Sequence, residues 1–239
     1  MHFDIITIFP ELFPGTLGAG VVGRALANGI WSYRAINPRD FATDSHRTVD
    51  DAAFGGMDGQ VMMAEPIAKA IDGIRNSEFG IRDKIIYFSP RGKLLTQKLV
   101  REFNAESRIP NPEFRFILLC GRYEGVDQRL LDEYGAIEIS VGDYILSGGE
   151  IAAQVFIDSC VRLCDNVVRG GEIATKSESF EIGGLEWPLY TRPLSWRGRI
   201  VPEVLASGHR ANIEKWRKNQ SDALTKERRP DLLKGRKNV

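Results

Sequence analysis

The sequence contains no long apolar stretch and no recognisable export signal. Its uninterrupted apolar runs are short, as in residues 116–120, whereas a membrane-spanning helix needs about 18 consecutive apolar residues. The first residues, MHFD, lack the basic start and the small-residue cleavage site of a secretory signal. We therefore expect a protein of the cytoplasm with no membrane partner.

Cysteine and histidine are also scarce, with three of each in 239 residues. An odd number of cysteines in a chain of this size is typical of a reducing compartment and does not suggest a disulfide scaffold. The histidines are scattered, and none lies near Cys120, Cys160 or Cys164. This distribution predicts no zinc site.

Neither sign of charge dominates, because 32 basic residues balance 32 acidic ones. The two signs are unevenly distributed, however, since residues 196–239 hold 12 of the basic residues and only 5 of the acidic ones. Such a basic tail is typical either of a segment that binds a polyanion or of a solvated helix. Charge alone does not decide between these two interpretations.

Runs of β-branched and aromatic residues alternate with amphipathic stretches over residues 1–165, which predicts an α/β domain whose parallel sheet is covered on both faces. Residues 166–195 have no sustained period and predict a linker. After them, Asn212 is a candidate helix cap and Pro230 a candidate stop for a small, basic, helical domain. The expected strands are 3–9, 30–36, 84–89, 114–120 and 136–140, and the expected helices are 16–28, 65–76, 94–106, 124–134, 148–164, 213–221 and 222–226.

Residues 18–23 (GAGVVG) match the letters of the dinucleotide-binding fingerprint. That fingerprint forms a tight turn directly after a strand. Here eight residues, which include Pro10 and Pro14, separate the segment from the first predicted strand. We interpret the glycines as part of a helix, and a dinucleotide-dependent oxidoreductase is the alternative that this motif leaves open.

Three other glycine-bearing segments each follow a predicted strand. They are residues 89–93 (SPRGK), 121–125 (GRYEG) and 142–149 (GDYILSGG). In open α/β sheets ligands bind at the carboxyl ends of the strands, and glycine lets backbone groups approach a flat ligand closely. Three successive loops at one sheet edge predict a small-molecule pocket.

Several long segments of the chain are distinctive when taken together. They are 9–13 (FPELF), 37–41 (NPRDF), 46–51 (HRTVDD), 119–129 (LCGRYEGVDQR), 139–150 (ISVGDYILSGGE), 189–193 (LYTRP), 208–217 (GH at its start, KWR at its end) and 228–233 (RRPDLL). In sequence and order these segments resemble the bacterial tRNA (guanine-N1)-methyltransferases of the SPOUT superfamily. The resemblance covers nearly the whole chain.

The resemblance implies the SPOUT fold, which is an α/β parallel sheet with a deep C-terminal trefoil knot, plus a small helical C-terminal domain. It implies a methyltransferase domain over 1–165, a linker with an active-site loop over 166–195 and a tRNA-binding domain over 196–239. In that family the knotted loops hold S-adenosyl-L-methionine. The matching positions in this chain are Tyr87, Phe88, Ser89, Pro90, Gly121, Glu124, Val141, Gly142, Asp143, Tyr144, Ile145, Leu146, Gly148 and Gly149.

Methyl transfer to N1 of guanine needs a base for the N1 proton and a cation for the negative charge that develops on O6. By resemblance the cation is Arg162, and the base is Glu178 in the loop 176–180 (KSESF). The family usually has Asp where this chain has Glu178. The longer side chain carries the same carboxylate one methylene further out.

The resemblance also implies a target and partners. The target is N1 of the guanosine 3′-adjacent to the anticodon (position 37) of tRNA, and the enzyme is a homodimer whose active sites combine residues of both chains. Some members need Mg²⁺, for which this sequence shows no dedicated carboxylate cage. The residues expected to contact tRNA are His46, Asp50, Gly59, His209 and Arg217, with further phosphate contacts from basic residues of the tail.

Two other functions stay open at this stage. One is a SPOUT methyltransferase that acts on a different RNA guanosine. This alternative is relevant because residues 50–60 (DDAAFGGMDGQ) keep Asp50 and Gly59 but otherwise depart from the family pattern. The other is a non-catalytic RNA-binding module that depends on the basic tail alone.

Overall fold

A computed structural model of the chain describes residues 1–56, 58–77, 82–108 and 114–233. The chain forms two compact units, Met1–Arg169 and Gly170–Val239, each with its own set of internal contacts. The finer division into three parts, with boundaries at residues 165 and 195, stays a prediction.

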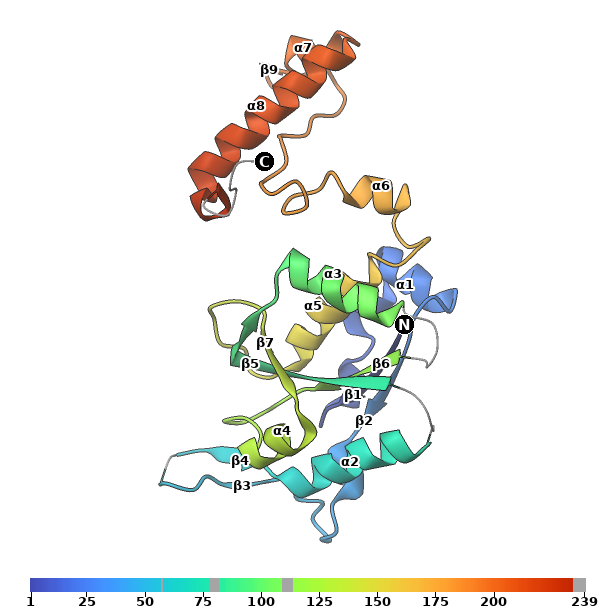
Figure 1. Ribbon diagram of the computed structural model, residues 1–239, viewed down its shortest axis with the longest axis vertical. Helices are drawn as coiled ribbons and strands as arrows, with labels where there is room; N and C mark the ends of the chain where they lie inside the picture. Colours follow the sequence, from blue (N-terminus) through green and yellow to red (C-terminus); the bar gives the residue numbers. More distant parts are fainter. Residues whose placement is uncertain (57, 78–81, 109–113, 234–239) are drawn as a thin grey trace. The chain divides into compact units, whose positions relative to one another are not determined.

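The first unit is built on a five-stranded sheet in which every neighbouring pair of strands is parallel (Figure 1). The predicted parallel α/β sheet is therefore confirmed. In spatial order the strands are β2 (Ser32–Ile36), β1 (His2–Ile6), β6 (Phe114–Leu119), β5 (Arg82–Leu94) and β7 (Ile137–Ser140).

Helices cover both faces of this sheet, because its central strands are apolar on both sides. Along β6, Phe116 and Leu118 pack into one buried cluster, whereas Ile117 and Leu119 pack into the other. The first cluster lies under α1 (Gly20–Ala27), α3 (Gln97–Ser107) and α5 (Glu150–Val161), and the second under α2 (Ala64–Ser77) and α4 (Gln128–Tyr134) (Figure 1).

The strand β5 departs from the prediction at its carboxyl end. The sequence predicts a loop over residues 89–93, but β5 continues to Leu94. Phe88 and Lys93 both pair with Ile139 of β7, so the four residues between them bulge out of the ladder. Gly92 makes this possible, because a Cβ there would collide with the backbone of Ile139.

Residues 18–23 do not form the dinucleotide-binding turn. Two 3-10 turns, η1 (Pro10–Leu12) and η2 (Gly15–Gly18), lie between β1 and α1. Gly18 ends η2, and Gly20 and Gly23 belong to α1. Gly23 serves close packing, since a Cβ there would collide with the carbonyl of Gly18.

A small antiparallel hairpin, β3 (Asp50–Ala52) and β4 (Gln60–Met62), projects from the first unit (Figure 1). This hairpin is not predicted from the sequence, because its strands have only three residues each. Its base joins the segment after β6, where Met62 pairs with Val126 in a parallel bridge. The amide of Glu124 also donates to the carbonyl of Gln60 at 2.9 Å.

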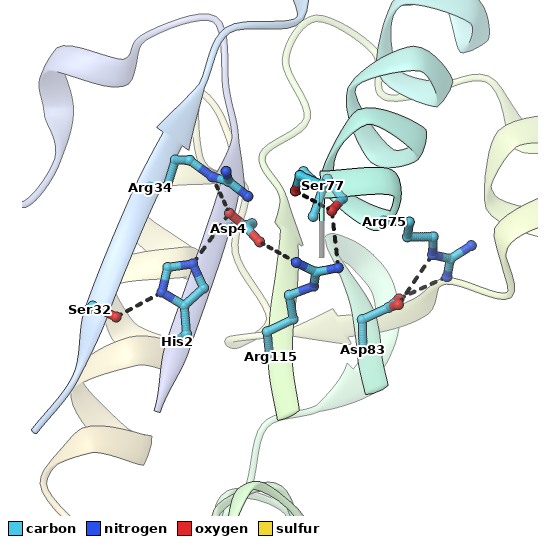
Figure 2. Close-up of polar contacts among 9 residues, drawn as sticks. His2, Asp4, Ser32, Arg34, Arg75, Ser77, Asp83 and Arg115 are labelled. Carbon is cyan, nitrogen blue, oxygen red and sulfur yellow. Dashed lines mark hydrogen bonds and ion pairs between the residues drawn. The ribbon is translucent and has the colours of Figure 1, made fainter. Parts of the chain in front are cut away.

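A buried charge network lies among the strands of the first unit (Figure 2). Asp4 is fully buried and accepts hydrogen bonds from Arg34 at 2.7 Å and from the ring of His2 at 3.4 Å. The guanidinium of Arg115, also buried, lies 3.8 Å from the other carboxylate oxygen and donates to the carbonyl of Ile74. Burial raises the pKa of Asp4, but hydrogen bonds from His2 and Arg34 outweigh it and hold that pKa below its usual value.

The second unit contains helices and one small hairpin. The two expected helices at its C-terminal end are a single helix, α8 (Arg210–Arg228), whose N-cap is His209 and not Asn212. The helix ends just before Pro230, as predicted. The other elements are α6 (Gly171–Thr175), which lies in the segment expected to be linker, β8 (Ser195–Trp196), β9 (Arg199–Ile200), α7 (Glu203–Ala206) and η4 (Pro230–Leu233).

Candidate active site

A cavity of about 250 Å³ opens in the first unit, beside the carboxyl ends of β6 and β7. Three separate segments form its walls: part of β5, the segment after β6 and the loop after β7. The lining residues are Tyr87, Phe88, Ser89, Pro90, Gly121, Arg122, Tyr123, Glu124, Gly125, Ile139, Ser140, Val141, Gly142, Tyr144, Ile145, Leu146, Ser147, Gly148, Gly149 and Ala152. All the predicted cofactor-binding residues line it except Asp143.

Glycines allow these three segments to lie against one another. The amide of Gly149 donates to the carbonyl of Gly121 at 2.9 Å, which joins the second and third walls. A Cβ on Gly149 would lie only 2.8 Å from the Cα of Cys120, and one on Gly121 would lie 2.8 Å from the ring of Tyr87. Only glycine fits at either position without displacing a neighbour.

The side chain of Arg122 holds the loop after β7 in place. Its guanidinium forms an ion pair with the buried Glu150 at 3.0 Å and donates to the carbonyl of Ser147 at 3.1 Å. It also lies over the ring of Phe9, 4.5 Å from the ring centroid. Glu150 in turn accepts a hydrogen bond from Thr7 at 2.7 Å. The segments after β1, β6 and β7 are therefore held together behind the cavity.

Two buried groups at the cavity, the Tyr87 hydroxyl and the Cys120 thiol, stay neutral near pH 7. Burial raises the pKa of the Tyr87 hydroxyl and raises the pKa of the Cys120 thiol well above its usual value. Neither group therefore contributes a negative charge to the cavity. The walls offer backbone groups, hydroxyls and apolar surface, which suit a flat ligand with hydrogen-bonding edges.

The hairpin β3–β4 stands at the edge of this cavity. A Cβ on Gly59 would lie 2.7 Å from the Cγ of Glu124, so the hairpin packs directly on a lining residue. Asp50 at the start of the hairpin forms a hydrogen bond with Tyr123, and burial together with this bond raises the pKa of the tyrosine. The predicted substrate residues Asp50 and Gly59 therefore lie beside the predicted cofactor residues, and His46 lies in the exposed segment before the hairpin.

The predicted catalytic residues lie in different units. Arg162 follows α5 in the first unit and is partly buried. Glu178 follows α6 in the second unit, where its amide donates to the carbonyl of Thr175. The other two predicted substrate residues, His209 and Arg217, belong to the N-terminal end and the middle of α8.

A model of the family "tRNA (Guanine-1)-methyltransferase TrmD" matches residues 1–235. Proteins named tRNA (guanine-N(1)-)-methyltransferase are similar over almost their full length. The protein of Rhodospirillum rubrum is 51% identical over 95% of this chain and 90% of its own. The protein of Mesorhizobium japonicum is 51% identical over 96% and 95%, and that of Rickettsia prowazekii is 47% identical over 98% of both chains.

The chain belongs to the tRNA (guanine-1)-methyltransferase family. It is therefore an enzyme of the methyltransferase class, and the resemblance found in the sequence is confirmed. Family membership excludes both the dinucleotide-dependent oxidoreductase and the non-catalytic RNA-binding module. Within the residues that the structure describes, no helix is both long and apolar enough to cross a membrane, and no cluster of His, Cys, Asp or Glu has the arrangement of a metal site.

The structure adds residues to the lining of this cavity that sequence reasoning missed. Arg122, Tyr123 and Gly125 fall within the segment 121–125 that the glycine pattern singled out, so that pattern could have found them. The cavity is also lined by residues within three positions of predicted ones in the sequence: Ile139, Ser140, Ser147 and Ala152. Asp143 is the one predicted cofactor residue outside the lining.

Proposed function

We propose that this enzyme transfers a methyl group from S-adenosyl-L-methionine to N1 of the guanosine 3′-adjacent to the anticodon, position 37 of tRNA. The observation that carries the proposal is the three-walled cavity at the carboxyl edge of the sheet, with the hairpin that holds Asp50 and Gly59 packed on its edge. Family membership supports both the reaction and the substrate. The reaction belongs in the cytoplasm, where tRNA is processed.

The cavity fits S-adenosyl-L-methionine by its chemistry. Leu146, Ile145 and Ala152 supply apolar surface for an adenine ring, and the closely packed glycine backbones leave amide and carbonyl groups for its edges. The bound molecule supplies an electrophilic methyl group. The bulge in β5, the segment after β6 and the loop after β7 are the parts that we propose to form the trefoil knot, which would hold these walls in place.

The proposed roles of Glu178 and Arg162 follow from the charges in the reaction. Guanine N1 carries a proton in the neutral base, so a carboxylate must remove it before or during methyl transfer. We assign that step to Glu178. The negative charge then develops on O6, and Arg162 would stabilise it with a charge-assisted hydrogen bond.

In a homodimer, the first unit of one chain and the second unit of its partner would together form one active site. The outer face of α5 supports this proposal, because Ile151 and Val155 are 56% and 45% exposed although they are apolar. Leu12, whose carbonyl accepts from Gln154 of the same helix, extends this face and is 40% exposed. A second copy of the chain that packs on α5 would cover this apolar face. The contact would lie close to the cavity, because Ala152 of the same helix lines it.

The second unit is proposed to bind tRNA through its phosphates. The residues that would make these contacts are Arg210, Lys215, Arg217, Lys218, Arg228 and Arg229, together with His209. Any Mg²⁺ that the reaction uses would bind to the RNA or to the cofactor and not to a cluster of protein carboxylates. Affinity for tRNA should fall steeply with salt, because binding releases counterions.

Incorporation of labelled methyl groups into unmodified tRNA, followed by nucleoside analysis, tests the proposal. We expect 1-methylguanosine in wild-type tRNA and none in a tRNA whose guanosine 37 is replaced by adenosine. Equal methylation of both tRNAs would instead support a SPOUT methyltransferase that acts on a different RNA guanosine. No incorporation into any RNA would refute the proposed reaction.

A further inference from the structure

The second unit has a cavity of its own, between α8 and the segment that precedes β8. Its volume is about 420 Å³, within the range of roughly 300–1,000 Å³ that is typical of small-ligand sites. Seven of the residues that the structure describes line it, and five of these belong to α8. Two hydrogen bonds fix its floor: Ser221 donates to the carbonyl of Leu185 at 2.6 Å, and the amide of Leu185 donates to Thr225 at 2.8 Å.

One wall of this cavity is a stacked pair. The guanidinium of Arg217 lies over the ring of Trp187, with 4.9 Å between its central carbon and the ring centroid. Arg217 is exposed, whereas Trp187 is partly buried. The contact holds the guanidinium as a flat surface at the cavity, and RNA bases stack on such arginine planes and on aromatic rings.

The other walls carry charges of both signs. Lys218 is a donor for a phosphate group, whereas the carboxylates of Glu214 and Asp222 are acceptors. Glu214 is oriented by Arg210, which donates to it at 2.9 Å. A ligand whose charges and shape complement these walls has a flat ring, N–H donors on one edge and a phosphate.

We propose that this cavity binds one unpaired nucleotide of the tRNA, with its base stacked on Arg217 and its Watson–Crick edge toward the carboxylates. Guanine is the best fit, because its N1–H and N2 amino group are adjacent donors for one carboxylate. Uracil is the worst, since two carbonyls flank its single N–H. Arg217 would then contact a base rather than a phosphate, and the second unit would read a base while its other basic residues hold phosphates. This inference rests on the proposed function for the identity of the RNA.

Tryptophan fluorescence with nucleoside monophosphates tests the cavity directly. We expect guanosine monophosphate to quench the emission with at least tenfold higher affinity than uridine monophosphate. The quench should disappear in Trp187→Phe, because the reporter is lost, and persist in Trp196→Phe, whose indole also lies under an arginine but outside this cavity. A quench that Trp196→Phe abolishes, or equal affinities for the two nucleotides, would overturn the proposal.

Kinetics with tRNA test whether the enzyme uses the site. Trp187→Ala should raise KM for tRNA about tenfold, because Arg217 loses the ring that holds its guanidinium in place to stack on the base. The kcat and the affinity for S-adenosyl-L-methionine should stay unchanged. Asp222→Asn should raise the same KM without altering the melting temperature, whereas Glu227→Gln, on α8 but outside the cavity, serves as its control. Unchanged KM in both Trp187→Ala and Asp222→Asn would refute the inference while wild-type methylation stands. An inactive wild-type enzyme would refute the proposed function alone, because the nucleotide titrations do not depend on catalysis.

Discussion

The amide of Gly149 donates a hydrogen bond to the carbonyl oxygen of Gly121 across 2.9 Å. These two glycines are 28 positions apart in the sequence, and their hydrogen bond joins two walls of the cavity. The approach depends on the absence of side chains, since a Cβ on Gly149 would meet the backbone of Cys120. The affinity of the cavity for its cofactor should therefore depend on both positions.

Gly149→Ala is expected to lower the affinity for S-adenosyl-L-methionine at least tenfold, or about 1.4 kcal/mol, because the two walls must separate. Gly121→Val should do the same by displacing the ring of Tyr87. Calorimetric titration measures the change. Gly73→Ala is the matched control, since its Cβ would lie 3.5 Å from the ring of Phe41, an ordinary contact. Wild-type affinity in a folded Gly149→Ala protein would show that the cofactor binds elsewhere.

The buried network of Figure 2 predicts a dependence of stability on pH. Asp4→Asn should lower the free energy of unfolding by about 3 kcal/mol at pH 7, because it removes the carboxylate charge beside the buried Arg115. The pKa of Asp4 is lowered in the folded protein from the usual 3.8. Its contribution is therefore complete above that pH and is lost as the pH falls through the lower, folded value.

Urea unfolding of wild type and Asp4→Asn from pH 7 to pH 3 measures this effect. The difference between the two proteins should shrink below pH 4. Asp83→Asn is the control, because its partner Arg75 is 41% exposed and such pairs contribute about 1 kcal/mol or less. A difference that stays constant down to pH 3 would mean that the charge of Asp4 does not stabilise the fold.

The tip of the hairpin β3–β4 carries Phe54, whose side chain is 96% exposed. An aromatic ring so fully exposed, on an element that packs against the cavity, is suited to stack on a base of the RNA. Phe54→Ala should raise KM for tRNA about tenfold through the lost stacking contact and leave cofactor affinity unchanged, whereas Phe54→Tyr should behave as wild type. Identical kinetics for wild type, Phe54→Ala and Phe54→Tyr would show that this ring does not contribute to substrate binding.

The sheet and its helices could be predicted from the sequence because their signals are local. The run 116–119 (FILL) is apolar on both faces of its strand, and 150–161 repeats its apolar residues at helical spacing. Pairings between distant residues leave no such signal. The ion pair between Arg122 and Glu150 joins two segments, and neither segment's own sequence indicates the contact. Likewise, residues 50–52 form a strand only because they pair with Gln60–Met62.

Local signals also misled in two places. Pro90 and Gly92 indicate a turn, yet pairing of β5 with β7 resumes at Lys93, because the sheet tolerates a bulge there. Asn212 has the side chain of a helix cap, but α8 begins two residues earlier at Arg210. In both places the element extends beyond the boundary that the local pattern predicts.

Glu178, which by resemblance stands where the family usually has Asp, is the proposed base of the reaction. Glu178→Gln keeps the size and polarity of the side chain but cannot accept the N1 proton, so single-turnover methyl transfer should slow about a hundredfold or more. Glu178→Asp restores the family's usual residue and should retain activity. Arg162→Ala should also slow the reaction, because the charge on O6 loses its partner.

Cofactor affinity, measured by calorimetry, should hardly change in Glu178→Gln, which separates the loss of a base from the loss of the binding site. A wild-type single-turnover rate in Glu178→Gln would move the role of base to another carboxylate, and Asp50, on the hairpin at the edge of the cavity, would be the next to substitute.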